Sequence, residues 1–233
     1  MSNNYFQFKQ FTVYHDLCAM KVGVDGVLLG AWADCRNVEL ALDVGTGSGL
    51  IALMLAQRSK GTVHAIDIDE NACKQAEINF NNSPFHDRLS IESVAFQDFS
   101  SSVRYDLIAS NPPYFSQSLK SPDPNRNLAR HNDCLPLEAL IKKSASLLSP
   151  QGKAAFILPF DRLEEMHAYI VENHLFICRE TLVSSLQNRP PKRVLIEYSL
   201  INHGRTEKNG FYIGETKRTY SDEYRALTKE FYL

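Results

Sequence analysis

Short apolar runs and longer amphipathic segments alternate along most of the chain. The apolar runs have the length of buried strands and occur at 39–44, 62–67, 89–94, 105–110, 153–159 and 192–200. Segments of helical character lie among them, at 50–59, 70–82, 137–148 and 161–174. In the second of these, Ala72, Ala76 and Phe80 recur every four residues, so they share one face of a helix.

This alternation of strands and helices is typical of an α/β fold. Right-handed crossovers between parallel strands place helices on both faces of one sheet. We therefore predict a doubly wound, Rossmann-like sheet that is mostly parallel, with an antiparallel strand near the C-terminus. Ligands of such sheets bind outside the carboxyl ends of the strands, so the residues that follow each strand are the first candidates for a site.

Two stretches lie outside this alternating core. The first contains MKVGVDGVLLGAWA, which predicts a loop followed by a helix, with Asp25 as a candidate helix cap. After Ile201 the chain is polar and rich in turn residues, and a short helix is expected at its end. We interpret 1–233 as one domain, with an N-terminal extension over the ligand site (1–39), a core (40–201) and a C-terminal extension (202–233).

The composition of the 233 residues, 44% hydrophobic with a formal charge of −2, is that of an ordinary globular protein. No segment reaches the roughly 20 apolar residues of a membrane span, and the first residues lack the apolar core of a signal peptide. A cytoplasmic location is therefore expected. The five cysteines are far apart without a C-x-x-C pair, and the seven histidines show no ligand spacing, so neither a disulfide framework nor a bound metal is expected. We expect a monomer.

The first core strand runs into a glycine-rich turn, LDVGTGSGL, at the start of a helix. Gly45, Gly47 and Gly49 permit a tight turn and close approach of a ligand, and the helix N-terminus adds free N–H groups. Their G-x-G-x-G spacing differs from the G-x-G-x-x-G of dinucleotide sites. Asp43 would repel a pyrophosphate and attract a ligand with a sulfonium and an ammonium group. The turn and this acid resemble motif I of S-adenosylmethionine-dependent methyltransferases, although a plain strand–helix turn also fits.

Two more acidic positions follow predicted strands. Asp67 ends the second strand, where a carboxylate can accept both hydroxyls of a ribose, and Ile68 offers an apolar face to an adenine ring. Asp69 is expected to cap the next helix. Asp98 and Phe99 follow the third strand, and Asp98 can accept the amino group of an adenine or serve as a turn residue. The series of glycine turn, Asp67 and Asp98 favours S-adenosylmethionine as the cofactor.

The fourth strand ends in Asn111-Pro112-Pro113-Tyr114, although the interior of a sheet excludes proline. The side-chain carbonyl of Asn111 and the main-chain carbonyl of Pro112 can accept the two protons of a planar exocyclic amine. Pro113 restricts residue 112 to extended conformations, which gives its carbonyl a set direction. Tyr114 can stack on the planar group. We expect these four residues to be catalytic, with Asn111 also contacting the cofactor, although a turn that only closes the strand is an alternative.

The Asn-Pro-Pro-Tyr motif resembles that of methyltransferases acting on exocyclic amines or amides. Together with MKVGVDGVLLGAW, the segment Ala129 to His131 and the ending TYSDEYRALTKEFYL, it resembles the bacterial family that methylates N6 of an adenine in valine tRNA. The resemblance covers nearly the whole chain and implies a tRNA substrate, with the target immediately 3′ of the anticodon. It also implies that the loop from Lys21 to Gly26 packs over the cofactor, with Lys21 near its carboxylate.

Two segments are locally basic although the chain as a whole is slightly acidic. Residues 116–131 contain three basic residues and one acidic residue, and the chain from Leu186 onward contains nine basic and six acidic residues. Basic clusters with nearby aromatic residues suit phosphates and unstacked bases. The candidate RNA-binding residues are Arg126, Arg130, His131, Arg189, Lys192 and Arg193. A solvated surface unrelated to RNA would show the same charges.

Other activities remain open at the level of sequence. A glutamine N5-methyltransferase of release factors also uses an Asn-Pro-Pro-Tyr motif, on the planar amide of its substrate. Against this alternative, the N-terminal segment is short and lacks an obvious helical substrate-binding domain. DNA adenine methylation is a variant of the same chemistry. A non-catalytic RNA-binding module would not need the intact Asn-Pro-Pro-Tyr motif and the cofactor acids. A nicotinamide oxidoreductase is disfavoured by the spacing of the glycines.

Overall fold

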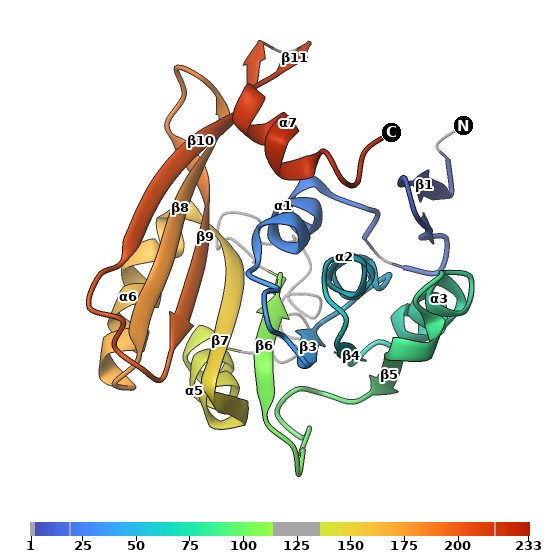
Figure 1. The fold of residues 1–233 in the computed structure, drawn as a ribbon, viewed down its shortest axis with the longest axis horizontal. Helices are drawn as coiled ribbons and strands as arrows, with labels where there is room; N and C mark the ends of the chain where they lie inside the picture. The colour runs from blue at the N-terminus through green and yellow to red at the C-terminus, as the bar shows by residue number, and fades with distance from the viewer. Residues whose placement is uncertain (1–2, 19, 114–135, 217) are drawn as a thin grey trace, which may run out of the picture.

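The computed structural model describes residues 3–18, 20–113, 136–216 and 218–233, and a nine-stranded sheet forms its centre (Figure 1). The strands lie in the order β11-β10-β8-β9-β7-β6-β3-β4-β5. Their bounds are β3 (Leu40–Val44), β4 (Thr62–Asp67), β5 (Leu89–Ser93), β6 (Tyr105–Ser110), β7 (Leu148–Pro159), β8 (Phe176–Leu186), β9 (Pro191–Ser199), β10 (Glu207–Thr216) and β11 (Thr219–Tyr220). A separate hairpin consists of β1 (Tyr5–Gln7) and β2 (Thr12–Tyr14).

Most neighbouring strands of the sheet are parallel. β3 pairs in parallel with β4 and β6, β4 with β5, β6 with β7, and β8 with β10. β9 lies antiparallel between β7 and β8, and β11 is antiparallel to β10. The prediction of a mostly parallel, doubly wound sheet with an antiparallel strand near the C-terminus is confirmed. Since β8 and β10 run in the direction of β7, the carboxyl ends of these strands lie at the same edge as those of β3, β4 and β6.

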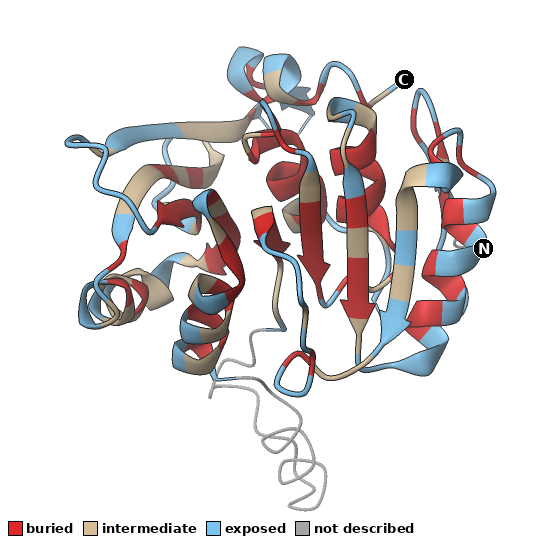
Figure 2. Cartoon of the chain, turned by 60° about the horizontal axis from the view of Figure 1, so that its bottom comes forward, coloured by how far each residue is buried: buried red, intermediate tan, exposed pale blue. Residues whose placement is uncertain are grey.

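Helices cover both faces of the sheet and leave its central strands buried between them (Figures 1 and 2). On one face lie α1 (Val24–Trp32), α2 (Leu50–Arg58), α3 (Glu70–Asn81) and α7 (Asp222–Thr228), and on the other α5 (Leu137–Leu147) and α6 (Leu163–Glu172). Two short 3-10 turns are η1 (His86–Arg88) and η2 (Phe160–Arg162). Alternate strand residues enter the two cores: Leu107 packs with the first group of helices, and Ile108 with the second.

The six expected strands and the expected helices are present, with one boundary displaced. α5 ends at Leu147 and β7 begins at Leu148, before the expected start at residue 153. Strands β1, β2, β8, β10 and β11 were not expected from the sequence. In β8, charged residues interrupt the apolar pattern, but each has a partner on its own face of the sheet: Arg179 stacks on Trp32 of α1, and Glu180 pairs with His167 of α6. β10 is polar because much of it is exposed.

The expected cap of α1 was wrong. The helix begins at Val24 after Gly23, and no side chain caps it. Asp25 lies in the first turn of α1, where the helix dipole favours an acid, and its carboxylate pairs with the guanidinium of Arg193 at 2.8 Å. This ion pair joins the start of α1 to β9.

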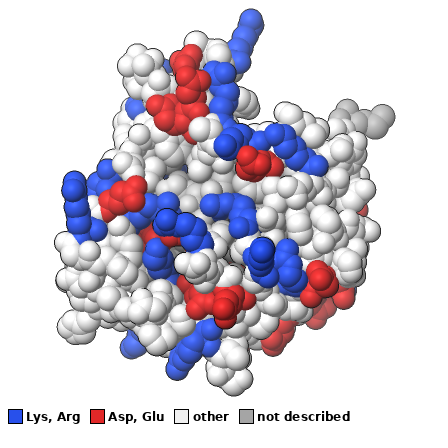
Figure 3. All heavy atoms as spheres, in the orientation of Figure 1, with Lys and Arg blue, Asp and Glu red and all other residues white. Residues whose placement is uncertain are grey.

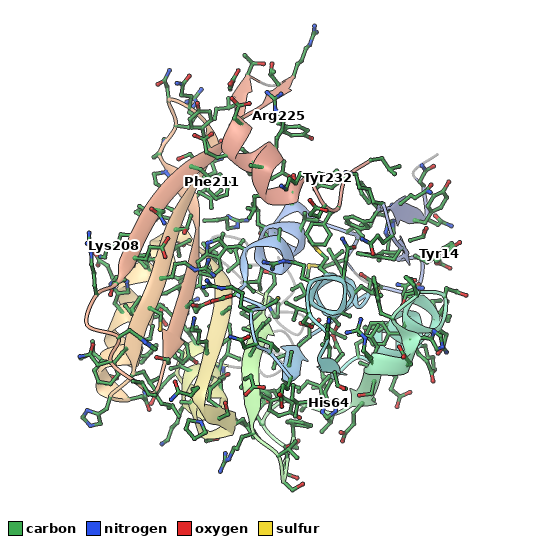
Figure 4. The ribbon with its side chains drawn as sticks, viewed as in Figure 1. Tyr14, His64, Lys208, Phe211, Arg225 and Tyr232 are labelled. Atoms are coloured by element: carbon green, nitrogen blue, oxygen red, sulfur yellow. The ribbon has the colours of Figure 1, made fainter. Side chains whose placement is uncertain are left out.

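The N-terminal and C-terminal segments lie side by side (Figure 1). The N–H of Lys9 donates to the carbonyl of Phe231 at 2.8 Å, and the rings of Phe8 and Tyr232 stack with centroids 6.1 Å apart. Figure 4 shows Tyr232 just beyond α7, on the side of the N-terminal hairpin. In addition, Gln57 of α2 donates to the carbonyl of Glu230 at 2.9 Å. Both extensions are therefore tied to each other and to the core.

Helices α1 and α2 approach closely at Gly30, which faces Met54. A Cβ atom at Gly30 would lie 2.7 Å from the Met54 sulfur and 2.9 Å from the Met54 Cβ. The Met54 Cβ is attached directly to the backbone of α2 and cannot move without it. We therefore expect Gly30→Ala to push the two helices apart. The free energy of unfolding should fall by about 1–2 kcal/mol, after allowance for the better helix propensity of alanine.

Urea unfolding measures this change, and Gly210→Ala is the matched control. A Cβ at Gly210 would lie 3.5 Å from the carbonyl of Leu182, an ordinary contact. The control should remain within about 0.5 kcal/mol of the original protein. Equal stabilities of the two variants would contradict a tight contact at Gly30.

Candidate functional site

Three candidate residues lie in one row at the carboxyl edge of the sheet. In the strand register, Val44 of β3 pairs with Ile66 of β4 on one side and with Ser110 of β6 on the other. The next residue of each strand is Gly45, Asp67 or Asn111. The glycine turn, the ribose-type acid and the first residue of the Asn-Pro-Pro segment are therefore neighbours, as expected for parallel strands.

The three glycines of the turn all adopt left-handed backbone conformations, with φ between 57° and 81°. A Cβ at Gly45 or Gly47 would meet no atom within 4 Å, so these positions leave the edge of the sheet open. A Cβ at Gly49 would lie 2.5 Å from the ring of Phe80 in α3. Two glycines thus keep a cradle free that side chains would fill, and the third permits close packing of the turn on α3.

Asp67 holds the turn from the side of β4. Its Oδ2 accepts the N–H of Gly47 at 2.8 Å, and its Oδ1 accepts the N–H of Asp69 at 3.0 Å. Each carboxylate oxygen keeps capacity for a further hydrogen bond, as two ribose hydroxyls require. Ile68 beside it is 60% exposed, although it is a large apolar residue. Asp69 caps α3 by accepting the N–H of Asn71 at 2.8 Å, as predicted.

Asp43 holds the turn from the inside and is fully buried. Its Oδ2 accepts the hydroxyl of Thr46 at 2.6 Å and the N–H of Ala52 at 3.0 Å. Its Oδ1 is buried and has no hydrogen-bond partner among the described residues. Burial raises the pKa of Asp43 to about 7, against the lowering effect of the bonds from Thr46 and Ala52. An unpaired carboxylate oxygen behind the turn fits a ligand that carries positive charge.

Asp98 and Phe99 follow β5 in a short turn, in which the N–H of Asp98 donates to the carbonyl of Ala95 at 2.9 Å. The Asp98 side chain is exposed. The Phe99 side chain is only 7% exposed and belongs to the core on the α5 side of the sheet, near Tyr105. This packing gives Phe99 a structural role, and its contact with a cofactor stays a prediction.

The segment after β6 leaves the sheet without regular structure, with Asn111 and Pro112 half-buried and Pro113 exposed. Ser110, which the sequence did not single out, donates its hydroxyl to the carbonyl of Val44 at 2.8 Å. This bond ties the end of β6 to the end of β3 and fixes the point from which Asn111 emerges. Tyr114 lies outside the described residues.

The candidate basic residues differ in their surroundings. Arg189 is exposed in the turn between β8 and β9 and Lys192 is exposed at the start of β9, whereas Arg193 is engaged with Asp25. Lys21 is exposed before α1. Arg126, Arg130 and His131 lie outside the described residues. Figure 3 shows Lys and Arg side chains across the middle of one face, interspersed with Asp and Glu.

Two surface hollows of about 600 and 350 Å³ lie at the opposite edge of the sheet, near the amino ends of β3, β4 and β7. Arg36, Asn37 and Val38 line both. Neither hollow is lined by Gly45, Asp67 or Asn111. Within the described ranges, no group of three His, Cys, Asp or Glu side chains is placed to hold a metal, and no helix has the length and apolarity of a membrane span.

The buried Asp43 should make the stability of the protein depend on pH. Between its ordinary pKa of 3.8 and about 7, the folded chain binds more protons than the unfolded chain. Its contribution to the free energy of unfolding therefore falls as pH rises through this window and is constant above it. Each pKa unit corresponds to about 1.4 kcal/mol.

We expect the Asp43→Asn variant to lack this fall. Urea unfolding at several pH values between 5 and 8 should show the variant gaining stability relative to the original protein as pH rises toward about 7. Asp98→Asn, at an exposed position, is the control. Parallel pH profiles for Asp43→Asn and the original protein would contradict the assignment.

Comparisons with known proteins agree with this geometry. The family model described as "Methyltransferase small domain" matches residues 28–159. Among solved structures, a predicted O-methyltransferase from Agrobacterium tumefaciens is similar with a TM-score of 0.67 and 17% identity, covering 89% of this chain and 96% of that one. A glycopeptide N-methyltransferase complexed with S-adenosyl-L-methionine has a TM-score of 0.56 and 13% identity, covering 78% of this chain and 90% of that one. At these identities the two structures establish the class I methyltransferase fold.

Curated relatives are far more similar in sequence. A tRNA1(Val) (adenine(37)-N6)-methyltransferase from Parabacteroides distasonis is 49% identical, covering 100% of this chain and 99% of the relative. A protein of the same name from Christiangramia forsetii is 41% identical with the same coverage. The aligned region thus covers both extensions as well as the core. The chain belongs to the methyltransferase small domain family and, within it, to the family of tRNA1(Val) (adenine(37)-N6)-methyltransferases.

Proposed function

We propose that this protein transfers a methyl group from S-adenosylmethionine to N6 of an adenine in tRNA, the adenine immediately 3′ of the anticodon of a valine tRNA. The observation that carries the proposal is the row formed by Gly45, Asp67 and Asn111 at one edge of the sheet. In this row the open glycine turn lies beside the Asn-Pro-Pro segment, which supports a cofactor site next to a site for an exocyclic amine. The names of full-length relatives supply the tRNA and the position.

S-adenosylmethionine is the cofactor, and when bound it supplies a methyl group on a positively charged sulfur. The open cradle at Gly45 and Gly47 and the buried, unpaired oxygen of Asp43 fit such a ligand. Asp67 accepts the ribose hydroxyls with the hydrogen-bonding capacity that its two backbone bonds leave. Ile68, exposed beside it, covers one face of the adenine ring.

Three further contacts complete the proposed cofactor site. Asp98 accepts the amino group of the adenine, and its exposed carboxylate is available for that bond. Phe99 supports this turn from the core. Lys21 pairs with the carboxylate of the cofactor from the segment before α1.

The target amine is a poor nucleophile because its lone pair is delocalised into the adenine ring. The Asn111 side-chain carbonyl and the Pro112 main-chain carbonyl accept the two amine protons and localise that lone pair on nitrogen. Pro113 fixes the direction of the Pro112 carbonyl, and Tyr114 stacks on the base. Such positioning is worth roughly 7–11 kcal/mol of the barrier in well-oriented reactions. The proposed catalytic residues therefore hold and polarise the amine.

We also propose that residues 1–233 form one domain that works as a monomer in the cytoplasm, where tRNA is modified. The contact of Lys9 with Phe231 and the shared core of Phe8, Trp32 and Tyr224 support a single unit. Arg126, Arg130, His131, Arg189, Lys192 and Arg193 are the proposed contacts to tRNA phosphates. Arg193 is already paired with Asp25, which offsets its charge, so we expect Arg189 and Lys192 to contribute more.

The test of the function is methyl transfer from labelled S-adenosylmethionine to total tRNA, with DNA and release factor as parallel substrates and nucleoside analysis of the product. The proposal predicts N6-methyladenosine in tRNA alone. Label on a release-factor glutamine or in DNA would instead support the corresponding alternative. Label in a tRNA other than the valine species would overturn the assignment of the substrate.

Asn111→Ala should remove one acceptor of the amine and leave tRNA binding nearly intact. We expect the methylation rate at saturating substrates to fall by at least about 100-fold, while the affinity for tRNA changes little. Single-turnover kinetics and filter binding measure the two quantities. The control is Asp67→Ala, which should weaken S-adenosylmethionine binding by about 1.5–3 kcal/mol. A rate within about threefold of the original would remove the catalytic role of Asn111.

Neutralising the basic loop, defined here as Arg189 in the β8–β9 turn and Lys192 at the start of β9, should change how tRNA binding depends on salt. Each lost phosphate contact lowers the slope of log affinity against log salt by roughly 0.7–0.9. In the Arg189→Ala, Lys192→Ala double variant we expect the slope to fall by the amount that corresponds to one or two phosphate contacts. The affinity for S-adenosylmethionine should not change. Lys60→Ala, at the opposite edge of the sheet, is the control. An unchanged slope would show that this loop is only a solvated surface.

A further inference from the structure

Helix α3 carries two buried amide side chains that the proposed function does not use. Gln75 is 1% exposed and Asn79 is 0% exposed. They are four residues apart and therefore share one face of the helix. Buried amides are retained only where their polar atoms find partners, so the partners indicate what these side chains do.

Asn79 joins three separate segments of the chain. Its Oδ1 accepts the N–H of Tyr14 at 2.9 Å, and its Nδ2 donates to the carbonyls of Tyr14 and Ser48, both at 2.8 Å. Both amide hydrogens are thus used, and the side chain binds Tyr14 as a neighbouring strand would. Ser48 lies inside the glycine turn, between Gly47 and Gly49. Asn79 therefore connects the N-terminal segment directly to the proposed cofactor turn.

The segment that Asn79 holds continues along the proposed site. The N–H of Leu17 donates to Oε1 of Gln75 at 3.0 Å, so α3 fixes this segment at a second point. Cys18 then comes within electrostatic reach of Asp67: burial, followed by the charge of Asp67, raises the pKa of its thiol to about 11. The segment from Tyr14 to Leu17 is thus held on α3 at two points, and one of the two anchoring residues, Asn79, also holds the glycine turn.

We propose that Asn79 is a positioning residue for the cofactor, because it fixes the glycine turn and the N-terminal segment to each other before the cofactor binds. This role rests on the cofactor site proposed above. A turn that is already fixed loses little conformational freedom when the ligand arrives, which strengthens binding. Asn79 contacts neither the methyl donor nor the target amine. Its loss should therefore weaken cofactor binding and leave the chemical step at saturation nearly unchanged.

The sharpest variant is Asn79→Asp, which has the same shape and keeps the acceptor for the Tyr14 N–H. It loses both donors and turns an oxygen toward the carbonyls of Tyr14 and Ser48. We expect the Kd for S-adenosylmethionine, measured by calorimetric titration, to rise about tenfold. The rate at saturating cofactor should stay within about twofold, and the KM for tRNA should not change.

Gln75→Glu is the matched control, because it also places a carboxylate on the buried face of α3. It keeps the acceptor for the Leu17 N–H, and among the described residues Gln75 makes no hydrogen bond to the glycine turn. Its Kd for S-adenosylmethionine should stay within about twofold of the original. Equal losses of affinity in the two variants would show that any disturbance of the N-terminal segment is sufficient, and would overturn a specific role for Asn79. An unchanged affinity in Asn79→Asp would overturn it as well.

Hydrogen exchange of the unmodified protein tests the same coupling without a variant that has to fold. Addition of S-adenosylmethionine should slow exchange at residues 14–17 and 45–49 together. Protection confined to 45–49 would overturn the coupling. If the unmodified protein does not bind S-adenosylmethionine, the proposed function itself fails. If it binds and Asn79→Asp binds equally well, only the positioning role fails.

Discussion

The alignment of three parallel strand ends is the constraint on which the rest of the site depends. Val44 pairs with Ile66 and with Ser110, and hydrophobic residues on both faces of these strands fix that register. A slip of one residue would exchange the residues that fill the two cores, such as Leu107 and Ile108, and disturb the packing of both, so the register is strongly specified. The hydroxyl of Ser110 adds a direct bond between β6 and β3. Without this alignment, the glycine turn and the Asn-Pro-Pro segment would not meet.

The glycine turn forms an open surface at these aligned strand ends, and several hydrogen bonds hold it in place. The N–H groups of Gly45 and Thr46 both donate to the carbonyl of Ile66, at 2.9 and 3.0 Å, so β4 holds the turn as firmly as β3 does. Asp67 then holds Gly47, and Asp43 holds the start of α2 through Ala52. The burial of Asp43 opposes folding, because its charged form is poorly solvated and one of its oxygens has no partner in the part of the chain that the structure describes. A polar group in that position is easier to explain by the ligand than by the fold.

Much of this arrangement could be predicted from the sequence because it rests on local signals. The apolar runs predict six strands, and the strand ends predict the positions of the glycine turn, Asp67 and Asn111. Other features depend on partners far along the chain. The charges of β8 are acceptable in a strand only because Trp32 and His167 lie opposite them. The local sequence indicates a helix cap at Asp25, because its actual partner, Arg193, is 168 residues away. Asn79 gave only a weak signal, because it shares its helix face with another polar residue, Gln75, and its partners Tyr14 and Ser48 are 65 and 31 residues away.

The two extensions make more contacts with the core than their composition indicates. The N-terminal segment reaches the glycine turn through Tyr14 and Asn79, and it reaches the C-terminal segment through Lys9 and Phe231. The glycine turn is thus supported through a chain of contacts whose members come from both ends of the sequence. Closing a long loop costs conformational entropy before such long-range contacts can form, so we expect these contacts to form late in folding. The βαβ units can establish the strand register locally, whereas the support behind the cradle is complete only when the residues around Phe231 have packed on Phe8 and α2.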